Sequence, residues 1–190
     1  SGFRENLIGK GVPTKKVFIV SNWVDTALYS PKTPDVDLSK DLELFGRFNI
    51  MYAGVVGLSQ GLDVLLEAAA LIASTHTIQF VIVGDGTELS RLQRLAEDRD
   101  LKNVRFLGRK PLSEMSGLYA LADALLISLS DDPLFRITIP HKVFTCMASG
   151  KPIIAALEGE GARIIEQAEA GITCKPGSPE GLALAVQKLY

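Results

Sequence analysis

The sequence predicts an α/β protein whose core is a doubly wound parallel β-sheet, and three observations support this fold class. Short apolar runs alternate along the chain with longer segments in which apolar residues recur at helical spacing. The runs are apolar at successive positions, as expected of parallel strands that are covered on both faces. The connections are short, which implies right-handed βαβ crossovers and therefore a doubly wound sheet.

Seven strands are expected from the apolar runs. In chain order they span residues 16–21, 49–53, 78–83, 104–107, 124–128, 152–156 and 172–174. The first stands apart, because a long loop rich in Pro, Asp and Ser follows it through Ser39. We expect this first segment to lie at the edge of the main sheet or to join the sheet to a part of the protein outside this chain.

Six helices are expected between and after the strands. The pattern is clearest where Leu62, Leu65, Leu66 and Ile72 form one apolar stripe. Ser178 and Pro179 indicate the start of the last helix, because proline is pre-organised for the first helical position. The helices are predicted over 62–74, 88–98, 113–120, 140–148, 161–169 and 179–189. Strands and helices together predict a Rossmann-like sheet.

The composition bounds the function. The chain of 190 residues is long enough for one sizeable domain. A net charge of −2 gives no reason to expect nucleic acid or an anionic membrane as a partner. Cys146 and Cys174 are too few for a disulfide scaffold and fit a reducing, cytoplasmic compartment. No apolar run approaches the roughly 18 residues of a membrane span, so we expect no membrane contact from this chain.

The candidate functional residues follow strand ends, because ligands of open α/β sheets bind beyond the carboxyl ends of the strands. The loop after the run at 49–53 reads GVVGLSQG, and Gly54 and Gly57 would let its backbone approach a phosphate closely. The same glycines are equally consistent with a simple turn from strand to helix.

A second glycine pair follows the run at 78–83. Gly84 and Gly86 resemble half of a dinucleotide-binding fingerprint, but Leu89 stands where its last glycine belongs. This spacing disfavours a nicotinamide cofactor and favours a turn that shapes a pocket wall.

Cations mark two further strand ends. Arg109 and Lys110 follow the run at 104–107 and can meet a phosphate, meet a ribose or remain solvated. Arg136, Thr138 and Lys142 lead into the helix predicted from residue 140. Thr138 can cap this helix, whereas the two cations oppose its dipole. A bound diphosphate would explain cations at this place.

Other kinds of catalysis have little support. The two histidines, His76 and His141, have no metal-ligand spacing with either cysteine, so no metal site is expected. Cys146 lies in an apolar helical pattern and is interpreted as a buried residue rather than a nucleophile. Neither a nucleophile elbow nor a Walker lysine is present.

The same segments resemble a known family, the retaining glycosyltransferases of group 1 type with the GT-B fold. The similarity is to their C-terminal half, which binds the nucleotide-sugar donor. Within the family, the pattern is most similar to bacterial surface-polysaccharide transferases that add fucose-type or N-acetylfucosamine-type sugars. The matching strings occur in order and cover nearly the whole chain: Gly11–Asp25, Tyr52–Ala69, Phe80–Gly86, Val104–Arg109, Leu118–Leu129, Ile139–Ile154 and Gly171–Ala183.

The resemblance implies a domain organisation and a set of partners. Residues 1–25 would be the tail of an N-terminal acceptor domain together with a connector strand, and residues 26–190 the donor-binding domain, truncated at its C-terminus. The donor would be a nucleoside-diphosphate sugar, with uridine as the expected nucleoside, and neither a cofactor nor a metal would be needed. The full-length protein would work in the cytoplasm or at the inner face of the membrane.

The resemblance also implies roles for particular residues. Gly54 and Gly57 would cover the donor diphosphate, and Arg109 and Lys110 would face the base. The helix that starts near Pro140 would point its amides at the phosphates. No catalytic residue is assigned, because the acid, base and acceptor groups would belong to the N-terminal half.

Four positions depart from the family pattern. Val55 and Gln60 replace an arginine and a lysine that contact the diphosphate, and Ile137 and Thr145 replace two glutamates near the donor sugar and the ribose. A charge-assisted hydrogen bond contributes roughly 1.5–3 kcal/mol, so losing several would weaken donor binding by orders of magnitude.

Neighbouring residues offer compensation, and they leave two alternatives to an active transferase. Arg136 and Lys142 can supply the missing positive charge, and Thr145 can still reach a ribose hydroxyl as a neutral partner. We therefore favour an altered site. One alternative is a degenerate, non-catalytic Rossmann-like binding domain. The other is an epimerase of UDP-sugars, which would need paired carboxylates and a histidine in the cleft.

Overall fold

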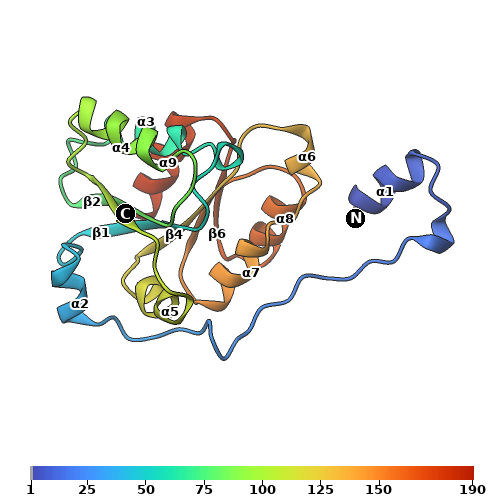
Figure 1. Cartoon of the computed structure of the whole chain (residues 1–190), viewed down its shortest axis with the longest axis horizontal. Coiled ribbons are helices and arrows are strands. Elements are labelled where there is room, and N and C mark those ends of the chain that lie inside the picture. The colour runs from blue at the N-terminus through green and yellow to red at the C-terminus, as the bar shows by residue number, and fades with distance from the viewer. Residues whose placement is uncertain (1) are drawn as a thin grey trace.

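A six-stranded parallel sheet forms the centre of the protein in the computed structural model, which describes residues 2–190. The strands lie in the order β3-β2-β1-β4-β5-β6, and every neighbouring pair is parallel (Figure 1). Their bounds are β1 Phe48–Ala53, β2 Ile78–Val83, β3 Val104–Gly108, β4 Ala124–Ser128, β5 Ile153–Ala156 and β6 Gly171–Cys174. This confirms the predicted Rossmann-like fold class. The strand order reverses between β1 and β4, which is where such sheets bind ligands.

Helices cover both faces of the sheet. The predicted ones form within a few residues of the expected bounds, as α3 Asp63–Leu71, α4 Leu89–Asp98, α5 Leu112–Ala120, α7 His141–Ala148, α8 Glu160–Gln167 and α9 Pro179–Leu189. Short elements that the sequence pattern did not predict are α1 Gly2–Gly9, α2 Val36–Asp41, α6 Pro133–Arg136 and the 3₁₀ turns η1 Thr14–Lys16 and η2 Leu58–Gln60. Asp35 caps α2 and Asp132 caps α6, each through its carboxylate.

Two apolar cores lie on the opposite faces of the sheet. Alternate residues of β1 divide between them, since Ile50 and Tyr52 pack under α3, α4 and α9, whereas Met51 packs against α5, α7 and α8 (Figure 1). All three side chains are at most 1% exposed. Coverage on both faces explains why the strands read as continuous apolar runs.

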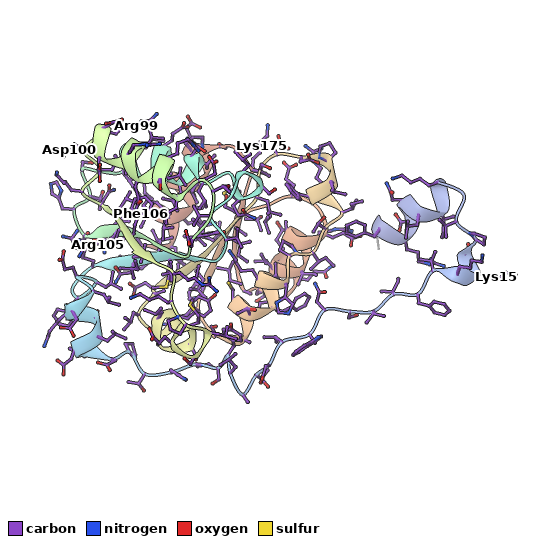
Figure 2. The ribbon with its side chains drawn as sticks, in the orientation of Figure 1. Lys15, Arg99, Asp100, Arg105, Phe106 and Lys175 are labelled. Atoms are coloured by element: carbon purple, nitrogen blue, oxygen red, sulfur yellow. The ribbon has the colours of Figure 1, made fainter. Side chains whose placement is uncertain are left out.

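The strand predicted over 16–21 is not formed. Lys16 ends a 3₁₀ turn, and the chain then runs extended toward α2 with no pairing strand among residues 2–190. Phe18 and Val20 are 84% and 89% exposed. Strand propensity does not hold an isolated segment, because its stability comes from neighbouring strands and burial. The N-terminal segment reaches far from the sheet, and Figure 2 shows Lys15 at the opposite end of the molecule from Arg105 and Phe106.

None of the described helices is long and apolar enough to cross a bilayer.

Candidate functional site

A cavity of about 640 Å³ lies at the carboxyl ends of β1, β2 and β3, beside the first turn of α7. Its place next to the reversal of strand order is the one expected for a ligand site in this class of sheet. Most of the predicted site residues meet in its wall. They are Gly54, Gly84, Arg109, Lys110, Lys142 and Thr145.

The floor of the cavity is built from backbone. The Gly54 N–H donates to the Val83 carbonyl at 2.8 Å, and the Gly84 N–H donates to the Gly108 carbonyl at 2.8 Å. These bonds continue the parallel ladder past the strand ends. A Cβ atom on Gly84 would overlap the Gly54 carbonyl oxygen, so Gly84 is required by the close approach of two loops.

Lys142 reaches into this floor from α7. Its Nζ lies 3.7 Å from the centroid of the Tyr52 ring, and a Cβ on Gly54 would stand 2.7 Å from that Nζ. Gly54 therefore leaves the space that the ammonium group occupies. Burial lowers the pKa of Lys142 to about 8, since desolvation disfavours its charged form.

The cavity carries more positive than negative charge. Arg109, Lys110 and Lys142 line it together with one carboxylate, that of Asp85. The Asp85 carboxylate accepts a hydrogen bond from the Gly86 N–H at 2.8 Å. None of the three cations forms an ion pair with any residue that the structure describes. Unpaired cations around a concave site favour an anionic ligand.

The first turn of α7 adds backbone donors. Pro140 precedes the helix and no side chain caps it. The first N–H groups of a helix have no acceptor within the helix, so those of His141 and Lys142 are available to a ligand. Thr145 lies one turn further along α7, is buried, and lines the same cavity.

Three predicted residues lie elsewhere. Arg136 pairs with Asp131 and Glu158, each at 3.2 Å, because the short helix α6 turns its side chain toward these carboxylates. The Thr138 hydroxyl donates to the Leu134 carbonyl at 2.8 Å. The Gly57 N–H donates to the side chain of Gln60 at 3.2 Å. The structure does not bring any of the three into the wall of the cavity.

Several residues that line the cavity were not predicted from the sequence. Tyr29 and Tyr119 stack with their ring centroids 5.9 Å apart, and Met115 lies on the same wall. Burial raises the pKa of Tyr119 above its ordinary range. Nothing in the linear pattern distinguishes these residues from core positions, and Tyr29 comes from a loop far from the others in sequence.

The remaining chemistry of the site is limited. Burial raises the pKa of the Cys146 thiol to about 12, in keeping with the interpretation of Cys146 as a buried apolar residue. Within the described part of the chain, no three His, Cys, Asp or Glu side chains are grouped closely enough to hold a metal ion. The paired carboxylates that an epimerase would need are not found in the described lining, where Asp85 stands alone.

Comparison with known proteins shows which family the chain belongs to. Residues 47–190 match the model of the family described as "Glycosyl transferases group 1", and the chain belongs to that family. It corresponds to the C-terminal domain of these enzymes, and its solved structural neighbours have the GT-B architecture.

Two relatives illustrate the similarity of sequence. The chain is 29% identical over 180 residues to WbjE of Pseudomonas aeruginosa, a probable glycosyltransferase, which covers 93% of this chain and 44% of the relative. It is 28% identical over 187 residues to WcaI of Escherichia coli, a putative colanic acid biosynthesis glycosyl transferase, which covers 95% and 46%. The chain thus spans about half the length of the curated relatives it matches.

Two solved structures illustrate the similarity of fold. HepE of Anabaena, in complex with UDP and glucose, superposes with a TM-score of 0.81 at 21% identity over 97% of this chain and 50% of that one. The C-terminal domain of LpcC, a group 1 family glycosyl transferase of Francisella tularensis, superposes with a TM-score of 0.71 at 21% identity. That match covers 88% of this chain and 87% of the LpcC domain.

Proposed function

We propose that this domain binds a nucleoside-diphosphate sugar, with uridine as the nucleoside, in the cavity beside α7. The full-length protein would transfer the sugar to a glycan acceptor in bacterial polysaccharide or glycoconjugate synthesis. The observation that carries the proposal is the group of three cations, without carboxylate partners in the described chain, around an uncapped helix N-terminus. Support also comes from the family and from HepE, which was solved with UDP and glucose.

Each part of the donor has a matching part of the cavity. The diphosphate would lie against Lys142 and the first turn of α7, where charge and backbone donors coincide. Thr145, one turn further along the helix, would face the ribose. Arg109 and Lys110 would lie near the base, at the end of β3. Arg136 and Thr138 are left out of this assignment, because they contact other groups.

The chemistry that this half contributes is electrostatic. As the bond between sugar and diphosphate breaks, negative charge grows on the leaving phosphate. Lys142 and the α7 amides are arranged where they would stabilise that charge. We propose transfer with retention and without a metal. We also propose a fucose-type or N-acetylfucosamine-type sugar, following the resemblance of sequence.

The acceptor would be held by an N-terminal domain, in line with the half-length coverage of the relatives. Residues 1–25 would then be the end of that domain and its connector. The exposed apolar side chains of Phe18 and Val20 are suited to burial against such a partner.

Calorimetry tests the binding step directly. The domain is titrated with UDP, GDP, ADP and NAD, and UDP is expected to bind most tightly. Lys142→Met and Arg109→Gln are each expected to weaken UDP binding by about 10- to 100-fold, because each removes a charge-assisted contact. Lys175→Met is the matched control, since Lys175 follows β6 outside the cavity (Figure 2).

Two outcomes would contradict the proposal. Absence of nucleotide binding below millimolar concentrations would favour the alternative of a degenerate domain that has lost its ligand. Unchanged UDP affinity in both Lys142→Met and Arg109→Gln would place the nucleotide outside this cavity.

A further inference from the structure

Tyr52, the fifth residue of β1, contacts two separate parts of the cavity. The face of its ring lies under the Lys142 ammonium group, with Nζ 3.7 Å from the ring centroid. Its hydroxyl donates to the carbonyl of Val55 at 2.5 Å, in the loop that follows β1. The side chain is fully buried, so neither contact depends on a mobile surface group.

We propose that Tyr52 is a positioning residue, which holds both the Lys142 ammonium group and the Gly54–Gly57 loop in place before a diphosphate arrives. The inference rests on the proposed function, because it assigns the preparation of that site to a residue that does not itself touch the donor. Pre-organised donors bind a charged ligand without the cost of rearranging them.

The ring suits this purpose better than a carboxylate would. An aromatic face attracts a cation within about 6 Å of its centroid, and the distance to Lys142 is well inside that limit. A carboxylate at this place would pair with the ammonium group and compete with the phosphate for it. The ring fixes the position of the charge and leaves its hydrogen-bond donors free for an anion.

The hydroxyl acts on the loop. The N–H groups of Gly54, Val56 and Gly57 donate to Val83, Asp85 and Gln60 respectively. The Val55 N–H has no acceptor among the described residues, and Val55 lines the cavity. The Val55 carbonyl belongs to the next peptide unit, whose Val56 N–H is already bound to Asp85. Tyr52 and Asp85 therefore hold the peptide directly beside the one whose N–H can turn to a ligand.

Other titratable groups near Lys142 must be separated from it in any test. Cys146 lies one turn along α7, Tyr119 comes from α5, and Tyr29 comes from the loop before α2. Burial raises the pKa of all three, so they stay neutral near pH 8. Asp85, Arg109, Lys110 and His141 share the cavity. Measurements between about pH 7.5 and 9.5 span the Lys142 pKa of about 8.

The first experiment needs no ligand. The titration of Lys142 is followed by NMR of ¹³C-labelled lysine in the wild-type domain, Tyr52→Phe and Tyr52→Leu. Tyr52→Leu removes the ring, and its Lys142 midpoint is expected to fall by about half a pH unit or more, because the ring favours the charged form. Tyr52→Phe keeps the ring and is expected to leave the midpoint where it is.

The second experiment measures UDP affinity by calorimetry at pH 7.5 and 9.5. Tyr52→Phe is expected to weaken UDP affinity by about 5- to 10-fold, equally at both pH values, because it removes only the hydrogen bond that restrains the loop. Tyr52→Leu is expected to weaken UDP affinity further. It is also expected to change the ratio of the UDP affinity at pH 7.5 to that at pH 9.5, here called the pH ratio. Phe80→Leu is the control, since Phe80 is an equally buried aromatic residue on β2 with no contact to Lys142.

The outcomes separate this inference from the proposed function. If UDP binds the wild type and Tyr52→Leu leaves both the Lys142 midpoint and the pH ratio unchanged, Tyr52 has only a structural role and the inference is overturned. If Phe80→Leu changes the pH ratio as much as Tyr52→Leu does, the inference is also overturned. If the wild type binds no UDP, the proposed function fails, and the Lys142 midpoint alone decides whether Tyr52 positions the lysine.

Discussion

Gly84 faces the carbonyl oxygen of Gly54 so closely that a Cβ atom on Gly84 would overlap that oxygen. The two residues lie at the ends of β2 and β1, and the Gly54 N–H donates to Val83 at 2.8 Å across the same junction. The spacing of the two loops that floor the cavity is therefore set by the absence of a side chain.

This relationship makes Gly84→Ala strongly destabilising. The new methyl group must push two loops apart, and we expect a loss of about 3 kcal/mol or more in the free energy of unfolding. Gly46→Ala is the matched control, because Gly46 also has a positive φ, of 74°, but a Cβ there meets nothing within 4 Å. Gly46→Ala should lower the free energy of unfolding by only about 1–2 kcal/mol. Equal losses in urea denaturation would show that backbone strain, not the contact between loops, dominates.

Arg136 is expected to be dispensable for nucleotide binding. Its ion pairs with Asp131 and Glu158 are solvent-exposed, and exposed pairs contribute about 0–1 kcal/mol. Arg136→Gln should therefore change stability by less than about 1 kcal/mol and leave the UDP affinity at the wild-type value in calorimetry. A clear loss of affinity, comparable with that of Lys142→Met, would return Arg136 to the binding site.

Binding of UDP near pH 8 should take up protons. The free protein holds Lys142 with a pKa of about 8, so roughly half of these lysines are uncharged at that pH. A nearby anion raises the pKa of a lysine, and the group therefore gains a proton as the diphosphate binds. Affinity should consequently fall as the pH rises from 7 to 9.5. Calorimetry in buffers of different ionisation enthalpy counts the protons, and Lys142→Met should abolish the uptake. Proton release in the wild type would contradict the assignment.

Trp23 should report ligand binding by fluorescence. It is the only tryptophan of the chain, it is 74% exposed, and its ring centroid lies 6.4 Å from that of His141, which lines the cavity. A ligand at the first turn of α7 changes the surroundings of this indole. Its emission should therefore change with UDP concentration and saturate at the affinity found by calorimetry. A response that is identical in Lys142→Met would mean that the signal arises outside the proposed site.

The fold was largely predictable because its strands are buried on both faces. The runs at 78–83 and 124–128 became β2 and β4 with the expected bounds, since continuous burial leaves a continuous apolar signal. The run at 16–21 carries the same signal but has no neighbouring strand to pair with, so the strand predicted there from β-propensity was wrong. The short helices α2 and α6 escaped prediction because single-turn elements depend on caps such as Asp35 and Asp132.

The site was predictable only where a strand end placed a residue directly. Gly54, Gly84 and Arg109 follow strands whose carboxyl ends meet at one edge, so position along the chain was enough. Arg136 was predicted to bind the diphosphate because it precedes α7 by a few residues. The short helix α6 instead turns its side chain toward Asp131 and Glu158. The contact between Tyr52 and Lys142 joins β1 to a helix some 90 residues later, and no linear pattern encodes such a pair.

The unpaired run around Phe18 and Val20 also has a consequence for handling the molecule. Its backbone is extended, its side chains are apolar, and no strand of the described chain pairs with its backbone on either side. Such a run is a template onto which a strand of another molecule can add. Self-association through this run should limit the concentration at which the isolated chain stays monomeric, and a lysine in place of Val20 should raise that limit.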